Sequence, residues 1–131
     1  MTEDDELFER LLKVAIGAAQ HGLQENGEFF PFAAGIGASG KAELILGDPA
    51  ADDVVASTEA ALQARRDELQ AAALVCDVLA DGDDTIYVDL CQPDGQAITV
   101  LLPYFKGDGD GALTYGKLRR GPGRLQLWPA G

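Results

Sequence analysis

The clearest alternation of apolar and polar positions lies within residues 85–105. Three apolar residues alternate before a turn and three alternate after it: Ile86, Val88, Leu90, Ile98, Val100 and Leu102. Period-two alternation of this kind predicts a β-hairpin. Pro93 and Gly95 suit a type I turn closed by a bulge, because proline fixes φ and glycine adopts positive φ. This turn pairs Gln92 with Gln96, which brings all six apolar residues to one face.

Apolar residues at helical spacing indicate two helices. The first covers residues 3–21, with Thr2 as its N-cap and His21-Gly22 at its end. Its apolar positions recur three and four residues apart: Leu7, Phe8, Leu11, Leu12, Ala15, Ala18 and Ala19. The second helix starts after Asp52 or Asp53, either of which can cap it.

Further strands are predicted on both sides of the second helix. Residues 29–36 and 41–46 form a second hairpin. Because proline donates no ladder hydrogen bond, Pro31 favours an edge strand or a strand with one free side at that position. Residues 71–79 fit either a continuation of the second helix or a strand. We favour the strand, because the strand that begins at Thr85 needs an antiparallel partner.

These elements predict one α+β domain spanning residues 1–131, since the chain is too short for two comfortable cores. The order is α-β-β-α-β-β-β, followed by a short C-terminal strand from the segments at 113–118 and 124–128. We expect an antiparallel sheet of about five to six strands with both helices on one face.

The charge of the chain restricts its partners. It carries 22 acidic and 10 basic residues, a net charge of −12, which repels phosphate backbones and anionic lipids. We therefore expect no nucleic-acid or membrane binding. Residues 111–131 differ, because they hold four basic residues and no acidic one. This basic end can dock on its own domain or on an acidic partner.

The N-terminus and the hydropathy of the chain predict a cytoplasmic protein. The first residues, Met1 to Glu6, are acidic where a signal peptide is basic. The longest smooth apolar run, residues 71–76, is far shorter than the ~18 residues that a membrane-spanning helix needs.

Residues 35–41 match the phosphate-binding pattern Gly-x-x-x-x-Gly-Lys, but Ala42 stands where that pattern needs Ser or Thr for magnesium. A phosphate-binding loop opens a helix, whereas residues 43–47 alternate and Pro49 interrupts them. We therefore predict a hairpin turn here, and no nucleotide or other cofactor.

Metal binding and disulfide formation are both disfavoured. The Asp-Gly repeats at 81–84 and 108–111 lack the spaced oxygens and final glutamate of an EF-hand loop. Cys76, Cys91 and the single His21 do not complete a zinc site. If Cys76 faces Val88, the two cysteines lie too far apart for a disulfide, so we expect both to be reduced.

One group of side chains suggests acid–base chemistry. If Cys76 faces Val88, Asp77 faces Tyr87 and Asp89 lies next along the same sheet face. Two neighbouring carboxylates can separate their pKa values and act as acid and base. An Asp77/Tyr87/Asp89 face is therefore the basis of the alternative function, a small-molecule-binding or hydrolytic enzyme. No residue is identified as catalytic, and the same arrangement is typical of a solvated sheet face.

The motif Gly27-Glu28-Phe29-x-Pro31-Phe32, with residues 95–97 and a late Pro103-Tyr104, resembles a group of small uncharacterised bacterial proteins. The resemblance covers most of the chain and implies a bacterial origin and the strands predicted above, including 72–79. The order of elements is also similar to that of profilin and roadblock proteins, most of which bind partners or pair with themselves. That similarity concerns topology alone.

The sequence favours a non-enzymatic binding or protein-interaction domain whose partner is another protein or a second copy. The predicted binding residues are Phe29, Tyr87, Asp89, Leu101 and Tyr104. An exposed Phe29 beside Tyr87, Leu101 or Tyr104 would form an apolar patch on the open face of the sheet, which favours a homodimer. The alternative is that residues 125–128 fold back and cover the patch within one monomer.

Overall fold

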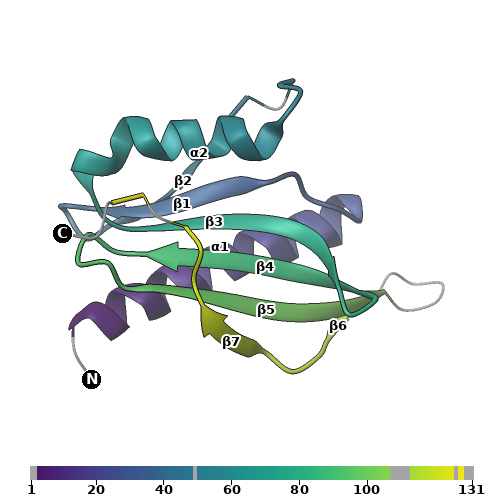
Figure 1. Ribbon diagram of the computed structural model, residues 1–131. Helices are drawn as coiled ribbons and strands as arrows, with labels where there is room; N and C mark the ends of the chain where they lie inside the picture. The colour runs from purple at the N-terminus through teal and green to yellow at the C-terminus, as the bar shows by residue number, and fades with distance from the viewer. Residues whose placement is uncertain (1–2, 49, 107–112, 126, 129–131) are drawn as a thin grey trace.

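The computed structural model describes residues 3–48, 50–106, 113–125 and 127–128 (Figure 1). In these residues two α-helices, one short 3₁₀ helix and seven strands follow one another: α1 (Glu3–Asn26), β1 (Phe32–Gly37), β2 (Ala42–Ile45), α2 (Val54–Arg65), η1 (Arg66–Glu68), β3 (Leu69–Ala80), β4 (Asp83–Cys91), β5 (Ala97–Lys106), β6 (Leu113–Tyr115) and β7 (Arg119–Pro122). The α+β class and the expected order are confirmed.

The strands form one antiparallel sheet in the order β2-β1-β3-β4-β5-β6, and β7 also pairs with β5. The segments β7 and β6 occupy successive parts of the same edge of β5, opposite its residues 98–101 and 104–106. Of the two placements expected for Pro31, the edge strand is wrong, because β1 lies between β2 and β3, whereas the position free of ladder pairing is the one observed. Strand β1 begins only at Phe32, so the missing donor of Pro31 interrupts no ladder.

The central hairpin has the predicted register, with Val88 opposite Val100 and Asp89 opposite Thr99. Its turn is also as predicted. The Gln92 amide donates to the Gln96 carbonyl at 3.0 Å, and Gly95 has a φ of 93°. The six alternating apolar residues therefore share one face of the sheet.

Strand β3 is confirmed, but its predicted register is wrong by one residue. Asp77 lies opposite Ile86 rather than Tyr87, because Ala80 pairs directly with Asp83. The intervening Asp81 and Gly82 have positive φ values of 53° and 85°, the geometry of a two-residue type I′ turn. The predicted turn was one residue longer, which moved every β3 side chain to the wrong face.

The two helices lie on opposite faces of the sheet, not on one (Figure 1). The first face packs α1 against β-strand residues that include Val75, Val88 and Val100. The second face packs α2 and the chain after β7 against residues that include Ala72 and Cys91. Strand β3 is apolar on both of its faces from Ala71 to Cys76, so both faces need a cover.

Helix α1 is longer than predicted. His21 and Gly22 lie inside it, and the chain leaves the helix at Gly27, which has a φ of 75° and donates to the Leu23 carbonyl at 2.9 Å. Gly22 serves packing instead, because a Cβ there would lie 2.9 Å from the Cβ of Phe29. The cap predicted at Thr2 and the turn predicted at 108–111 lie outside the described residues.

Candidate functional site

The predicted binding residues do not form one patch. Phe29 packs against the α1 core, where its ring lies 5.8 Å from that of Phe32, and Tyr104 is buried in the same core. Tyr87, Asp89 and Leu101 have the opposite strand parity and lie on the second face. The sheet therefore separates the five residues into two groups.

Asp89 is a buried carboxylate, 3% exposed, at the centre of a hydrogen-bond network. It accepts from the Tyr87 hydroxyl at 2.9 Å and from the Thr99 hydroxyl at 3.4 Å. Both of its oxygens also accept from the backbone N–H of Arg124, at 3.0 and 3.2 Å. Burial and the bond to Asp89 raise the pKa of Tyr87, so its hydroxyl stays a donor.

The Asp89 network fixes the chain after β7 on the second face. We call residues 123–125 and 127–128 the tail segment. Figure 1 shows this part of the chain crossing the sheet beside α2. Leu127 is 1% exposed, and Leu125 and Trp128 pack around the same cluster. The tail segment thus folds back on its own domain, as the alternative expected, but it covers the second face alone and not Phe29 or Tyr104.

A cleft of about 370 Å³ lies between α2, β3, β4 and the tail segment. Six of its lining residues are Glu59, Leu74, Cys76, Tyr87, Asp89 and Arg124. Burial, with the charges of Glu59 and Asp89, raises the pKa of Cys76 to about 11. This thiol is protonated at neutral pH and is a poor nucleophile. Cys76 and Cys91 are both free and buried, as expected.

Asp77 lies on the other side of the sheet from this cleft. Its two carboxylate oxygens accept from the Tyr104 hydroxyl at 2.8 and 3.0 Å. Burial and this bond raise the pKa of Tyr104 well above its usual value. The expected Asp77/Tyr87/Asp89 cluster does not form, because the one-residue change of register turns Asp77 to the α1 side.

The glycine-rich segment before Lys41 is the hairpin turn between β1 and β2, as predicted. Gly40, with a φ of 82°, donates to the Gly37 carbonyl at 2.9 Å, and the Ser39 hydroxyl accepts from the Lys41 N–H at 3.4 Å. A strand follows the turn instead of the helix that a phosphate-binding loop requires.

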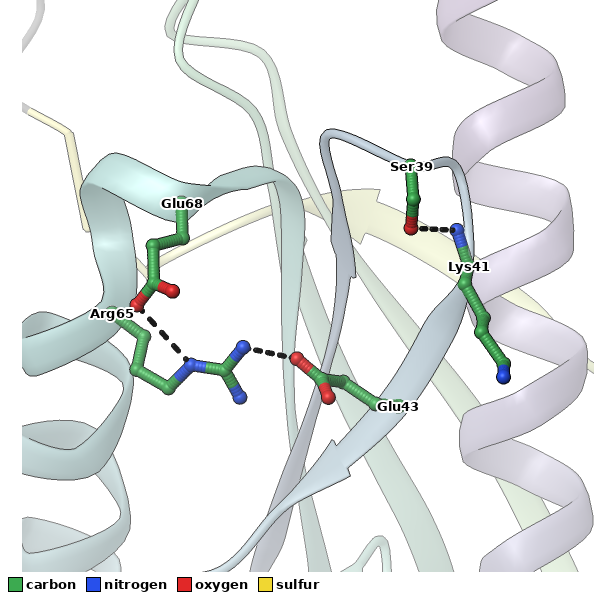
Figure 2. Close-up of polar contacts among 5 residues, drawn as sticks. All are labelled: Ser39, Lys41, Glu43, Arg65 and Glu68. Atoms are coloured by element: carbon green, nitrogen blue, oxygen red, sulfur yellow. Dashed lines mark hydrogen bonds and ion pairs between the residues drawn. The ribbon is translucent and has the colours of Figure 1, made fainter.

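A polar cleft of about 630 Å³ lies beside this turn. Figure 2 shows Arg65 between Glu43 and Glu68, while the side chain of Lys41 runs away from them. The guanidinium of Arg65 pairs with Glu43 and lies 3.5 Å from Glu68. Its charge is therefore already balanced by protein groups.

The apolar surface of greatest interest lies at the β2 edge of the sheet. Phe30, Leu44 and Leu46 are 66%, 49% and 70% exposed. An apolar cleft of about 270 Å³ joins them to Phe29, Pro31, Phe32, Val54, Ala18 and Gly47. We call Phe30, Leu44 and Leu46 the edge surface. The sequence predicted a different apolar patch, an exposed Phe29 beside Tyr87, Leu101 or Tyr104 on the open face of the sheet, and that patch does not form because Phe29 packs against the α1 core.

No three or more His, Cys, Asp or Glu side chains in the described ranges are grouped to hold a metal ion. Within those ranges, no helix combines the length and apolarity needed to cross a membrane. Comparison of the chain with protein-family models, curated proteins and solved structures finds no match.

Proposed function

We propose that this chain is a bacterial, cytoplasmic, non-enzymatic protein-interaction domain that binds a partner protein or a second copy through its edge surface. The observation that carries the proposal is the exposure of Phe30, Leu44 and Leu46 around one apolar cleft. Large apolar side chains that gather in this way on a folded surface mark interfaces.

The charges around the edge surface support a protein partner. One polar cleft beside the turn that leads into β2 holds Lys41 and Arg65 together with Glu43 and Glu68, although the chain as a whole carries a net charge of −12. Interface centres are depleted in net charge and rich in aromatic and aliphatic side chains. A nucleic acid would instead need an excess of basic residues.

The geometry of the second face counts against the enzyme alternative. Every oxygen of Asp89 accepts hydrogen bonds from groups that hold the tail segment, and Asp77 lies on the opposite side of the sheet. A carboxylate saturated by structural donors is poorly placed to move a proton to or from a substrate.

The proposal is tested with a matched pair of charge substitutions. Phe30→Glu introduces a carboxylate into the edge surface, while Leu79→Glu does so at a residue that is 74% exposed at the far end of β3. The tagged wild-type chain and both variants are used to capture partners from the native cell, and the self-association of each is measured by sedimentation equilibrium.

We expect Phe30→Glu to lose at least tenfold in affinity, because a charge buried in an apolar interface is strongly unfavourable. Leu79→Glu should retain wild-type binding. If Phe30→Glu keeps every partner and the self-association of the wild type, the edge surface is not the interface and the proposal fails.

A further inference from the structure

We infer that the β2 edge pairs with the β2 edge of a second copy, antiparallel, with Leu44 of each copy on the two-fold axis. This inference rests on the proposed function and names the partner of the same surface. It would join the two sheets into one continuous sheet. Four features of the edge lead to it: its unpaired backbone, the side on which its leucines lie, its register and its charge.

The outer edge of β2 is open. Strand β2 is the last in the sheet order, so no described strand pairs with its outer side. Gly37 donates to the Lys41 carbonyl at 3.3 Å, so the backbone groups of Lys41 point towards β1. Because this direction alternates in an antiparallel ladder, Ala42 and Leu44 present their N–H and C=O groups outward. Leu46 directly follows the last residue of β2 and has the same parity as Leu44.

The residues with outward backbone groups also carry the apolar side chains. Ala42 packs against the α1 core, and Leu44 and Leu46 share its parity, so their side chains lie on the α1 side. Ile45 has the opposite parity and is buried against the α2 side. A strand added to this edge would therefore gain main-chain hydrogen bonds and meet the leucines and Phe30 together.

The register of the pairing depends on which β2 residue lies on the two-fold axis, because that residue decides which side chains of the two copies face one another. An axis at Glu43 places that carboxylate opposite its own copy, which is unfavourable. An axis at Leu46 would place Leu44 opposite Asp48, whose N–H already donates to the Ser57 hydroxyl at 2.7 Å. An axis at Ala42 pairs Lys41 with Glu43 but leaves Leu46 uncovered, and a surface ion pair contributes less than the burial of a leucine.

An axis at Leu44 avoids these conflicts. It places Leu44 opposite Leu44 and Ala42 opposite Leu46, so six apolar side chains from the two copies share one side. Lys41, which is exposed, then lies opposite Gly47 and one residue from the exposed Asp48 of the second copy. The pairing thus brings apolar side chains together on one side and places a cation near an anion.

Because of the net charge of the chain, the salt dependence of self-association should differ from that of binding to a basic partner. Two bodies that each carry a net charge of −12 repel one another. Raising the NaCl concentration from about 0.02 M to about 0.3 M screens this repulsion and should strengthen self-association. Binding to a basic partner would weaken under the same change.

Single-cysteine cross-linking tests the axis. Leu44→Cys places two thiols on it, with Cα atoms about 5.5 Å apart, within the range that a disulfide spans. Glu43→Cys is the register control, because the two Cα atoms would be roughly 8 Å apart. Leu79→Cys is the location control, and each variant keeps the buried Cys76 and Cys91. Copper-phenanthroline with oxygen serves as oxidant, and non-reducing gels measure the dimer.

We expect the Leu44→Cys variant to form a disulfide dimer at least tenfold faster than the other two. If it does not fold like the wild type by circular dichroism, an equimolar mixture of Ala42→Cys and Leu46→Cys chains replaces it. Those two positions are opposite one another, so the mixture should cross-link faster than either chain alone.

Two results would overturn the inference: equal cross-linking of all positions, or a single species near 13.8 kDa at every salt concentration. Either result would leave the proposed function standing if Phe30→Glu still loses a partner that Leu79→Glu keeps. If instead the chain dimerises through Leu44 and Phe30→Glu also loses the dimer, both are supported.

Discussion

The two faces of the sheet are covered in different ways. On the first face one helix of 24 residues, α1, packs against strands β1, β3, β4 and β5 through a continuous apolar core. On the second face α2 has only 12 residues, and the tail segment covers what the helix does not. A buried carboxylate, Asp89, holds that segment, and an open cleft remains beside it.

The two covers contribute differently to the stability of the whole domain and to that of one segment. Detachment of one long helix such as α1 would expose the whole core. Its contacts therefore contribute to the free energy of unfolding of the entire domain. The tail segment lies after the last strand and can detach while the sheet stays intact. We therefore expect equal changes in buried volume to have unequal effects on the two faces.

Truncation of one leucine on each face should show the largest difference. Leu11→Ala, at a residue with 0% exposure on α1, should lower the free energy of unfolding by about 3 kcal/mol. Leu127→Ala, at 1% exposure in the tail segment, should lower it by about 1 kcal/mol, because local detachment relieves the cavity. Urea unfolding followed by circular dichroism measures both.

An exposed leucine supplies the control for this pair. Leu79→Ala removes the same atoms from a side chain that is 74% exposed, and its effect should stay within about 0.5 kcal/mol. Equal losses for Leu11→Ala and Leu127→Ala would show that the tail segment belongs to the same cooperative unit as α1, contrary to the proposed distinction.

The first face was the more predictable from sequence. Its hairpin carries both an alternating pattern and a turn, Pro93 to Gly95, that fixes the register. The sequence also predicts a turn at Asp81 and Gly82, but it does not reveal that Asp81 has a positive φ. Unless the conformation of Asp81 is known, the length of the turn and the sheet face of Asp77 are undetermined. For this reason the sequence placed Asp77 on the same face as Tyr87 and Asp89.

The second face depends on contacts that no local pattern encodes. The backbone of Arg124 reaches Asp89 across 35 residues of chain, and alternation alone cannot reveal such a pairing. The edge surface was missed for a similar reason. Alternation shows that Leu44 and Ile45 point to opposite sides, but both are apolar, and only the position of α2 decides that Ile45 is the buried one.

A second substitution, Asp89→Asn, removes the negative charge that holds the tail segment. Asp89→Asn keeps the size of the side chain, but its amide nitrogen cannot accept from Arg124 or Tyr87. We expect a loss of about 2 kcal/mol, since a buried donor is left without its charged acceptor. Hydrogen exchange of the Arg124 amide should accelerate by at least tenfold while that of the β4 and β5 amides changes less.

Asp94→Asn is the matched control, because Asp94 is exposed and accepts from the N–H of Gln96, two residues away, at 2.8 Å. Its effect should be about 0.5 kcal/mol or less. Uniform acceleration of exchange throughout the sheet in Asp89→Asn would contradict a local role for Asp89.

The smallest expected effect is a decrease in stability at alkaline pH that arises on the second face. Cys76 and Cys91 both face α2 or the tail segment, and burial raises the pKa of each thiol from 9.0 to about 11. Above pH 9 the unfolded chain ionises these thiols while the folded chain keeps them protonated. The folded state then binds more protons, so stability falls as pH rises.

The contribution of the thiols is therefore fully present below pH 9 and is lost as pH rises through about 11. We expect the urea midpoint of the reduced wild type to fall over this window, and Cys76→Ala/Cys91→Ala to show a shallower fall from its own lower starting value. Tyr104→Phe on the first face removes a hydroxyl whose pKa is raised still further, so it should alter the slope only at the alkaline end. An unchanged slope in the double cysteine variant would show that ionisation of these thiols does not limit the stability of the second face.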